Sequence, residues 1–321
     1  MPEPLLEVRD LRIRFGRFTA VDGLSFALGP GEVLGVVGES GSGKSVSMLA
    51  VLGLIRTPGA HVSGNIVFRG RELLGLKDAE MRSVRGREIA MIFQDPMTAL
   101  TPVYTVGWQI AEQIRAHEKV SARAARDRAV RLLDEVGIPS PERRVDAYPH
   151  EFSGGMRQRA VIAMALSCNP ALLIADEPTT ALDVTTQAQI LDLMRRLRAD
   201  HGSAIVMITH DMGVVSEIAD EVLVMYGGRA VERGARRQVF HTPRHPYTWG
   251  LLDSVPRVRG PRARRLPAIP GAPGAAERGC PFADRCAHRF APCDEAPPLT
   301  PTGDPGHLDA CWLPEDRRRT R

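Results

Sequence analysis

Four short runs of mostly apolar residues are spaced along the first two thirds of the chain. They occupy positions 32–38, 89–93, 172–176 and 204–209. Runs of five to seven residues suit buried strands better than helices, which need more length. Strands that are apolar on both faces are typical of a parallel sheet covered by helices on either side. The pattern therefore predicts four central strands of such a sheet.

Between these runs, apolar residues recur at helical spacing. Ser121 can cap a helix that ends at Gly137, and the apolar positions of 190–197 predict another helix that ends before Gly202. Alternation of strands and helices favours an α/β fold with a parallel sheet.

Two parts of the chain depart from this alternation. The stretch from about 98 to 165 is rich in helical patterns without a strong strand signal, so we interpret it as a helical subdomain inserted in an α/β domain of residues 1–240. Fourteen of the 25 prolines and four of the five cysteines follow residue 240. Dense prolines exclude long helices and central strands, so 241–321 is predicted to be a loop-rich C-terminal extension.

Composition and charge indicate which broad class of protein the chain belongs to. Hydrophobic residues make up 43% and charged residues 25%, as in soluble globular proteins. The sequence has neither an apolar run of membrane-spanning length nor a signal peptide at its start, so we expect a cytosolic protein. The net charge of +4 is concentrated in arginines at 257–265 and 317–321. We interpret both runs as solvated tails, because no aromatic residues interleave with them to stack on nucleic-acid bases.

The segment 38–45, GESGSGKS, matches the phosphate-loop pattern, and it lies between an expected strand and an expected helix. Glycines allow backbone N–H groups to face a phosphate, and the helix dipole favours an anion there. Lys44 can reach the β- and γ-phosphates of ATP, and the Ser45 hydroxyl can bind Mg²⁺. The residues expected to contact ATP here are Gly38, Ser40, Gly41, Gly43, Lys44 and Ser45.

Two acidic residues end the apolar run at 172–176 or follow it directly. Asp176 can hold the Mg²⁺ shell, and the Glu177 carboxylate can orient and deprotonate a water that attacks the γ-phosphate. Together with the phosphate loop, this strand indicates ATP hydrolysis.

A second candidate anion site lies between these two motifs. Ser153, Gly154 and Gly155 precede an expected helix, and backbone N–H groups at a helix start attract anions. The motif is weak by itself, because it could simply cap the helix. Its position between the other two motifs makes it specific.

These motifs together resemble the ATP-binding-cassette (ABC) ATPases. In chain order they are the phosphate loop 38–45, Gln94, the signature 152–158, the acidic strand 172–177, Asp183 and His210. The resemblance covers residues 5 to about 240. It implies a phosphate-loop NTPase fold of ABC type: a RecA-like α/β core with a helical subdomain and an antiparallel β edge.

The resemblance also implies roles for individual residues. Phe15 would stack on adenine, Gln94 would bind Mg²⁺ and sense the membrane partner, and His210 would contact the γ-phosphate during catalysis. Asp183 would organise a dimer in which each signature closes over ATP held by the other subunit. Met156 stands where the family commonly has glutamine, but the backbone donors of the signature remain.

A closer resemblance is to the ATPases of dipeptide and oligopeptide importers, a family that includes nickel importers. It is carried by 94–107, 148–166, 175–190 and 245–248, although Thr101 stands where that pattern has asparagine. It implies a peripheral protein on the cytoplasmic face of the inner membrane. The implied partners are a second, paralogous ABC ATPase subunit, two multi-span permease subunits and an extracytoplasmic peptide-binding protein, with no nucleic acid.

Four cysteines cluster in the extension, while Cys168 stands apart in a helical pattern. The four are Cys280, Cys286, Cys293 and Cys311. Four thiolates suit zinc or an iron–sulfur cluster, and free thiols are a third state. The family resemblance favours a [4Fe-4S] cluster in a structural role. His288 and His307 could substitute as ligands, but we interpret them as surface histidines.

Three functions follow from these observations. The leading hypothesis is an ATPase that powers import of dipeptides or oligopeptides through a membrane permease, with nickel import as an alternative. A soluble ABC ATPase acting on nucleic acid or ribosomes is supported by the basic runs alone. A redox-sensing protein would require activity to depend on the cysteines.

Overall fold

The computed structural model describes residues 3–95, 99–180, 182–255, 268–272, 274, 276 and 278–319. The arginine run at 257–265 and the last residue of the run at 317–321 lie outside this part, as does residue 98 at the edge of the expected helical subdomain. The chain forms two compact units. The first comprises Met1–Gly29, Val33–Leu74 and Met207–Arg321, and the second comprises Pro30–Glu32 and Gly75–Val206.

The first unit contains an antiparallel sheet of four strands in the order β2-β1-β4-β5. These strands are β1 (Leu6–Phe15), β2 (Phe18–Leu28), β4 (Ala60–Phe68) and β5 (Arg71–Glu72). Alternating residues of β1 are buried, including Leu6, Leu11 and Ile13, as expected for a sheet with one solvated face.

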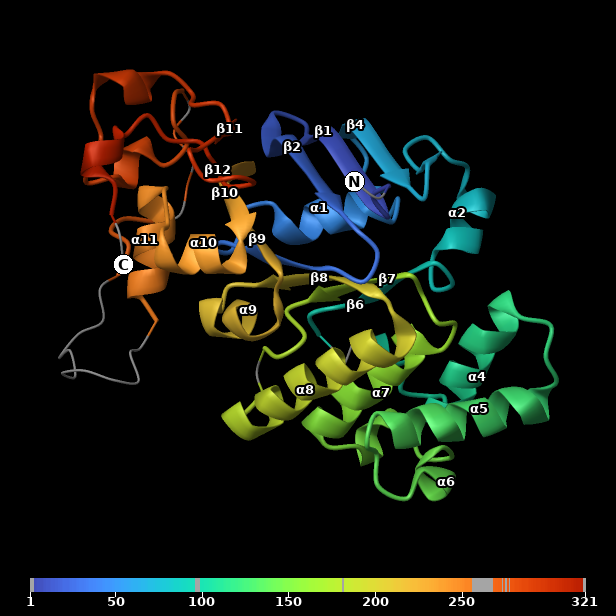
Figure 1. The fold of residues 1–321 in the computed structure, drawn as a ribbon. Coiled ribbons are helices and arrows are strands. Elements are labelled where there is room, and N and C mark those ends of the chain that lie inside the picture. The colour runs from blue at the N-terminus through green and yellow to red at the C-terminus, as the bar shows by residue number, and fades with distance from the viewer. Residues whose placement is uncertain are drawn as a thin grey trace. The chain divides into compact units, whose positions relative to one another are not determined.

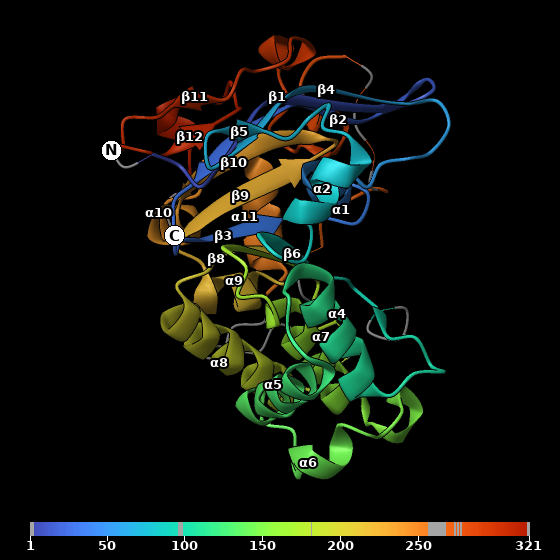
Figure 2. The same cartoon turned by 90° about the vertical axis from the view of Figure 1, so that its right-hand side faces the viewer.

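A second sheet of the same unit carries the phosphate loop. The parallel pair is β3 (Val33–Val37) and β9 (Glu221–Tyr226), and β10 (Arg229–Ala235) folds back antiparallel on β9 (Figure 2). Helices α1 (Lys44–Val51), α9 (Met212–Ile218) and α10 (Arg236–His241) belong to this unit. All five residues of β3 are buried, which is why its sequence is apolar without alternation.

The C-terminal extension lies in the same unit as the phosphate loop. It begins with α11 (Pro246–Asp253) and continues through the short 3₁₀ turns η2 (Ala283–Arg285), η3 (Ala291–Asp294) and η4 (Glu315–Arg317). Strand β12 (Leu308–Asp309) pairs with both β10 and β11 (Thr300–Pro301), so the extension adds two short strands to the sheet.

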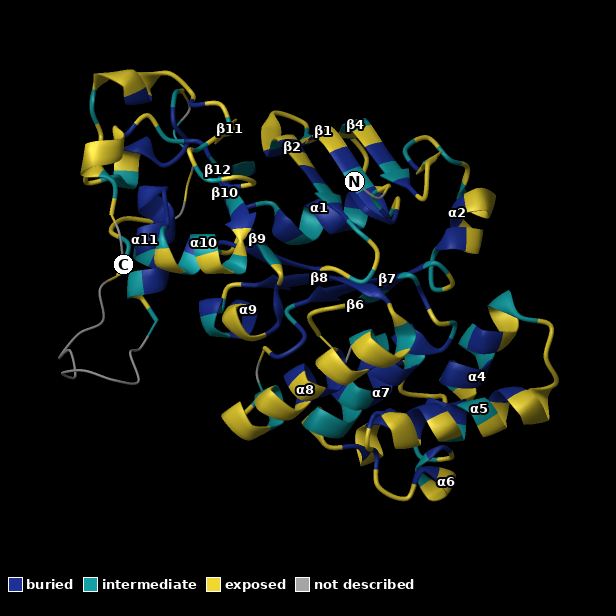
Figure 3. Ribbon diagram, viewed as in Figure 1, coloured by how far each residue is buried: buried dark blue, intermediate teal, exposed yellow. Residues whose placement is uncertain are grey.

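The second unit contains the parallel strands β6 (Ile89–Ile92) and β7 (Leu172–Asp176). Its helices are α2 (Asp78–Val84), α4 (Val106–His117), α5 (Ala122–Glu135), α6 (Pro141–Arg144), α7 (Gly154–Leu166) and α8 (Val184–His201), with a 3₁₀ turn η1 (Pro149–Glu151). Helices α4, α5 and α7 pack against one another (Figure 1). The amphipathic α8 buries Ile190, Leu193, Met194 and Leu197 and exposes the opposite face (Figure 3).

The predicted elements are confirmed. The four apolar runs form β3, β6, β7 and β8 (Ala204–Thr209), and every residue of β8 is buried. Ser121 caps α5, where its hydroxyl accepts a hydrogen bond from the Ala124 N–H at 3.2 Å. Gly202 ends α8 in the left-handed conformation, which glycine adopts without strain. Two parallel strand pairs, an antiparallel sheet and a helical stretch match the expected α/β class.

Candidate nucleotide-binding and catalytic site

The phosphate loop joins the buried strand β3 to α1 in the first unit. Gly43 precedes the first residue of α1 with φ of 97°, and a side chain there would lie 2.7 Å from the Ala20 carbonyl. At Gly38, with φ of 154°, an added Cβ would lie 2.2 Å from the Met225 carbonyl. Both positions therefore require glycine, because larger residues would collide with backbone of neighbouring strands.

Lys44 begins α1 and is 6% exposed. Its ammonium group donates hydrogen bonds to the carbonyls of Gly38 and Glu39, both at 2.8 Å, and to the Ser42 hydroxyl at 3.3 Å. A buried cation at a helix N-terminus, surrounded by glycine backbone, is suited to attract a polyphosphate. Ser45, the next residue, is half-buried in the same turn.

A pocket of about 240 Å³ adjoins the loop. It is lined by Glu39, Ser40, Gly41 and Ser42, by Phe18, Thr19 and Ala20 of β2, and by Tyr226, Gly227, Gly228 and Gly274. Phe18 is 65% exposed, whereas Phe15, its partner across the turn, pairs with Ala60 of β4 and is half-buried. The family resemblance points to Phe15, whereas Phe18, three residues later, is the aromatic residue that lines this pocket.

The acidic strand and Gln94 meet in the second unit. Because β6 and β7 are parallel, with Ile92 paired to Ala175, their carboxyl ends lie at one edge. The Gln94 side-chain amide donates to the Glu177 carboxylate at 3.0 Å, and the Thr180 hydroxyl donates to the same carboxylate oxygen at 2.8 Å. Asp176, the last residue of β7, is 6% exposed.

The backbone of Glu177 adopts φ of 47°, in the left-handed region that non-glycine residues rarely occupy. Such strain persists where surrounding contacts hold a residue in place, and it is concentrated at functional sites. The two hydrogen bonds from Gln94 and Thr180 direct the Glu177 carboxylate. Gln94 and the acidic strand are therefore in direct contact in the structure, a contact that the sequence analysis did not predict.

The signature motif starts α7 in the same unit. Ser153 caps the helix by accepting a hydrogen bond from the Met156 N–H at 3.3 Å. Ser153 and Gly154 are exposed, and a Cβ added at Gly154 would meet no atom within 4 Å. The first turn therefore offers a surface that a ligand can approach closely.

Thr186 links the signature to Asp183. A Cβ added at Gly155 would come within 3.0 Å of the Thr186 methyl group. Asp183 caps α8, accepting hydrogen bonds from the Thr186 N–H at 3.0 Å and from its hydroxyl at 2.6 Å. These hydrogen bonds hold the pKa of the Asp183 carboxyl below its usual value, so Asp183 is anionic at neutral pH.

His210 lies in the first unit, directly after β8, and its side chain is exposed. The following Asp211 caps α9 by accepting a hydrogen bond from the Gly213 N–H at 2.7 Å. His210 is therefore held between a buried strand and a capped helix, in the same unit as the phosphate loop.

The four clustered cysteines line one small cavity of the extension, together with the rings of Phe282, Phe290, Trp312 and His245. Burial raises the pKa of the Cys311 thiol to about 12, and burial also raises the pKa of Cys280 and Cys286. These thiols are protonated at neutral pH when nothing binds them. No group of three or more His, Cys, Asp or Glu side chains among the described residues has a metal-binding arrangement.

The two histidines of the extension differ. His288 lines the cysteine cavity at the surface, as expected. His307 is fully buried and its Nε2 lies 2.9 Å from Glu232, so the expectation of a surface position is wrong for His307. The reason is a long-range contact with β10, which no feature near His307 in the sequence indicates.

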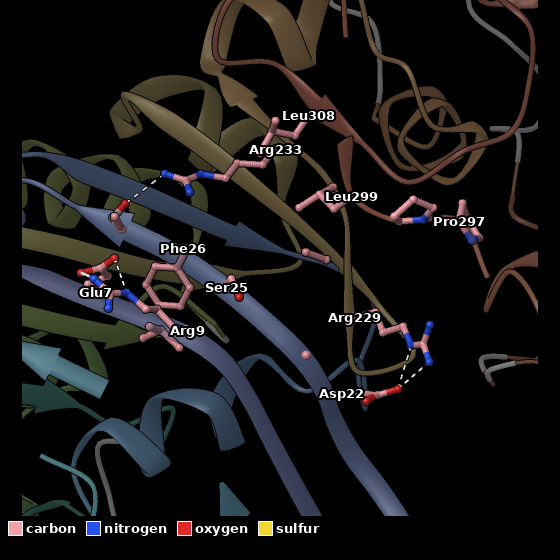
Figure 4. A pocket seen from close by; sticks show the side chains of 15 residues that line it. Glu7, Arg9, Asp22, Ser25, Phe26, Arg229, Arg233, Pro297, Leu299 and Leu308 are labelled. Atoms are coloured by element: carbon pink, nitrogen blue, oxygen red, sulfur yellow. Dashed lines mark hydrogen bonds and ion pairs between the residues drawn. The ribbon is translucent and has the colours of Figure 1, made fainter. Parts of the chain in front are cut away.

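A further hollow of the first unit is lined by β1, β2, β10 and the extension (Figure 4). Its charged side chains pair among themselves: Arg9 with Glu7 at 2.6 Å and Arg229 with Asp22 at 2.5 Å. Arg233 donates to Glu221, outside the hollow, at 2.6 Å. Because these arginines are paired with carboxylates, the described residues that line the hollow offer no free positive charge to bind an anion.

Residues 21–180 match the family described as ABC transporter, and residues 231–293 match the oligopeptide/dipeptide transporter C-terminal region. The oligopeptide transport ATP-binding protein OppD of Salmonella typhimurium is 52% identical over 98% of this chain and 96% of its own length. The dipeptide transport ATP-binding protein DppD of Bacillus subtilis is 49% identical over 98% of this chain and 96% of its own length.

Two solved structures share the fold. The cbiO1 protein of Clostridium perfringens, part of the ABC transporter complex cbiONQ, has a TM-score of 0.64 at 28% identity, over 74% of this chain and 91% of its own. The dimeric ATP-binding cassette MJ0796, bound to ADP and Pi, has a TM-score of 0.64 at 25% identity, over 72% of this chain and 99% of its own.

Proposed function

The chain belongs to the ABC transporter ATP-binding family, in its oligopeptide and dipeptide branch, and from this premise we propose that it hydrolyses ATP to power import of dipeptides or oligopeptides through a membrane permease. The observation that carries the catalytic part is Glu177, held in a strained backbone conformation by Gln94 and Thr180 at the end of the acidic strand. A complete phosphate loop with a buried Lys44 supports ATP as the substrate.

Each site residue has a defined task in this reaction. The phosphate-loop N–H groups and Lys44 bind the β- and γ-phosphates, and Glu177 orients the attacking water and accepts its proton. Phe15, or Phe18 of the adjoining pocket, stacks on adenine, and His210 contacts the γ-phosphate. Ser45, Gln94 and Asp176 offer the hydroxyl, amide and carboxylate oxygens that Mg²⁺ prefers. When bound, Mg²⁺ would neutralise charge on the phosphates.

Two nucleotide-binding subunits pair so that the signature of one closes over ATP held by the other. The open approach to Ser153 and Gly154 supports this arrangement, since exposed N–H groups at a helix start are suited to bind a phosphate. Asp183 accepts a hydrogen bond from the Thr186 N–H, and the Thr186 methyl group lies beside Gly155. Asp183 thereby organises the same surface. A paralogous ATPase subunit is the proposed partner.

Glu177→Gln tests the catalytic assignment. The amide keeps the size of the side chain but cannot accept a proton, so turnover should fall by at least about 100-fold while ATP still binds. ATPase rates and nucleotide affinity of the full chain measure the two effects. Glu217→Gln, on the exposed side of α9, is a control expected to leave turnover unchanged. Rapid turnover by Glu177→Gln would refute the assignment.

Permease subunits are the proposed membrane partners, and an extracytoplasmic binding protein supplies the peptide. None of the helices in the described part of the chain has the length and apolar character of a membrane span. The proposed partners would hold the chain at the cytoplasmic face of the inner membrane. The second unit exposes Tyr104 and Trp108, whose rings stack at 4.1 Å, and this aromatic pair is the proposed contact for the permease.

A pull-down of the tagged chain from its native membranes in mild detergent tests these partners. Recovery of multi-span permease subunits, a paralogous ATPase and a peptide-binding protein is the expected result. A nickel-binding companion would change the substrate, and recovery of ribosomes or nucleic acid alone would refute the transporter role.

The cysteine cavity is proposed to hold a [4Fe-4S] cluster with a structural role. Four thiols that line one cavity supply the kind and number of ligands that such a cluster takes, and cluster binding would have to draw them into a metal-binding arrangement that the described structure does not have. The buried His245 imidazole also lines this cavity, and its Nε2 has no hydrogen-bond partner. Since His245 Nδ1 accepts from the Tyr247 N–H, Nε2 carries the proton and would be satisfied by an anionic sulfur ligand.

Iron, zinc and acid-labile sulfide analysis of anaerobically purified protein tests this assignment. We expect iron and sulfide with a visible absorption band, lost in Cys286→Ser and retained in Cys168→Ser, which lies in the second unit. Stoichiometric zinc, or no metal in the unmodified protein, would refute the cluster.

A further inference from the structure

Glu39, the second residue of the phosphate loop, is held by the C-terminal extension through both its side chain and its backbone. The Arg285 guanidinium donates to the two carboxylate oxygens of Glu39, at 2.5 Å and 3.0 Å. The Glu39 N–H donates to the Tyr247 hydroxyl at 2.7 Å. These contacts join positions separated by more than 200 residues, and all three residues belong to the first unit.

Arg285 is a buried side chain that several contacts hold in place. Its side chain is 6% exposed. Its Nε donates to the Pro270 carbonyl at 2.8 Å, its Nη1 to the Tyr226 hydroxyl at 3.2 Å, and its guanidinium lies 5.9 Å from the centre of the Phe282 ring. A bidentate arginine–carboxylate pair with this much burial is strong and geometrically specific.

Tyr247 supplies the second contact from a rigid position. It is fully buried in α11, with its ring edge-on to Tyr226 at 4.7 Å between centres and next to Phe282 at 5.3 Å. The hydroxyl therefore has little freedom to move away from the Glu39 N–H.

The position of Glu39 matters for ATP on two grounds. Its carboxylate lies in the loop that receives the triphosphate, and an unpaired negative charge there would repel the ligand. Its carbonyl also accepts a hydrogen bond from Lys44 at 2.8 Å, so a displaced Glu39 would change the position of the ammonium group that binds phosphate.

We propose that Arg285 is a positioning residue for the phosphate loop: it neutralises Glu39 and, together with Tyr247, holds the loop in the conformation that binds ATP. The inference rests on the proposed ATP site and extends it to a residue outside the ABC motifs. Arg285 ends η2 and is followed directly by Cys286, so the fold of the cysteine-bearing segment sets the geometry of the loop.

Arg285→Gln in the full chain is the first test, with a fluorescent ATP analogue as the probe. We expect its affinity to fall by about tenfold, a usual size for coupling between groups, while kcat at saturating ATP changes less than about twofold. Arg289→Gln is the matched control, because Arg289 lies in the same segment but is half exposed and pairs with Asp284 and Asp294.

A double variant separates electrostatic positioning from simple structural support. Glu39→Gln with Arg285→Gln removes both charges, so affinity should return to within about threefold of the unmodified chain. If the double variant binds as weakly as Arg285→Gln alone, Arg285 acts only as structural support and the proposal is overturned. It is also overturned if Arg285→Gln matches Arg289→Gln.

Two further variants keep the test decisive. Should Arg285→Gln fail to fold, Tyr247→Phe removes only the hydroxyl acceptor of the Glu39 N–H and should weaken binding by about threefold. Unchanged affinity would then overturn the proposal. Lys44→Ala tests the ATP site itself. If this variant binds the ATP analogue as well as the unmodified chain does, the proposed function is wrong. If Lys44→Ala loses affinity for the analogue but Arg285→Gln does not, only the inference about Arg285 is wrong.

Discussion

The phosphate loop and the cysteine-bearing segment at 279–313 lie in the same unit and both lack long regular elements, yet they are held in place differently. The loop takes its local fold from its neighbours in sequence, the buried strand β3 before it and α1 after it, and the distant residues Arg285 and Tyr247 add contacts to Glu39. The cysteine segment is fixed by residues far away, above all the buried pair of His307 and Glu232.

Glu232 shows how much of the extension depends on one side chain. It is fully buried in β10, and its carboxylate accepts hydrogen bonds from the Arg244 N–H at 2.8 Å and the His245 N–H at 2.9 Å, in addition to its contact with His307. A segment without a large apolar core of its own thus relies on buried polar contacts, which are costly to break singly.

The largest effect is expected from Glu232→Ala. Removing the carboxylate leaves His307 and two backbone N–H groups unpaired inside the protein, so the free energy of unfolding should fall by about 3–5 kcal/mol. Denaturant unfolding measures the change, and Glu295→Ala, an exposed carboxylate of the same extension, is the control. Equal stability of the two variants would show that the extension is held by other contacts.

Lys44→Ala should have the opposite pattern to Glu232→Ala, with a large effect on ATP binding and a small effect on stability. We expect ATP affinity to fall by at least about 30-fold, because a buried cation that pairs with the phosphates is lost. Stability without nucleotide should change far less than in Glu232→Ala, since the partners of the ammonium group can bind water once ATP is absent. Titration with nucleotide and denaturant unfolding check the two halves of this prediction.

Acid should destabilise the extension through His245. Burial, reinforced by Arg318, lowers the pKa of His245 to about 3, so the folded protein keeps the imidazole neutral while the unfolded chain binds a proton below about pH 6.5. Stability is therefore fully present above that pH and is lost as pH falls toward 3. Between pH 7 and pH 5 the loss should be about 2 kcal/mol.

His245→Asn isolates this effect, because asparagine can still accept the Tyr247 N–H but does not titrate in this range. The variant should lose the His245 share of the acid sensitivity when unfolding is measured at pH 7 and pH 5. An unchanged pH dependence would assign the acid sensitivity to other groups.

Much of the fold was predictable because its signals are local. A buried strand requires an apolar run, a helix start favours a serine such as Ser121, and Gly202 can end a helix at positive φ. The contact between Gln94 and Glu177 was not predicted, because it depends on the pairing of β6 with β7, which are far apart in the sequence.

Other features of the structure could not be predicted from the residues next to them in the sequence. His307 has the sequence environment of a loop, and its burial depends on Glu232, 75 residues away. Phe18 and Phe15 are equally aromatic, and the turn between β1 and β2 decides which one is exposed beside the phosphate loop. Arg285 belongs to an arginine-rich extension in which sequence alone does not distinguish a buried ion pair from a solvated charge.

The amino-acid sequence was enough to identify the phosphate loop, because its glycines, Lys44 and Ser45 fall within eight residues between a buried strand and a helix, and such short spacing keeps them together. The hydrogen bonds that Arg285 and Tyr247 of the extension make with Glu39 of the phosphate loop are seen only in the folded structure. Distance along the chain explains the difference: residues a few positions apart are placed by local backbone geometry, whereas contacts across 200 residues form only when the whole unit has folded.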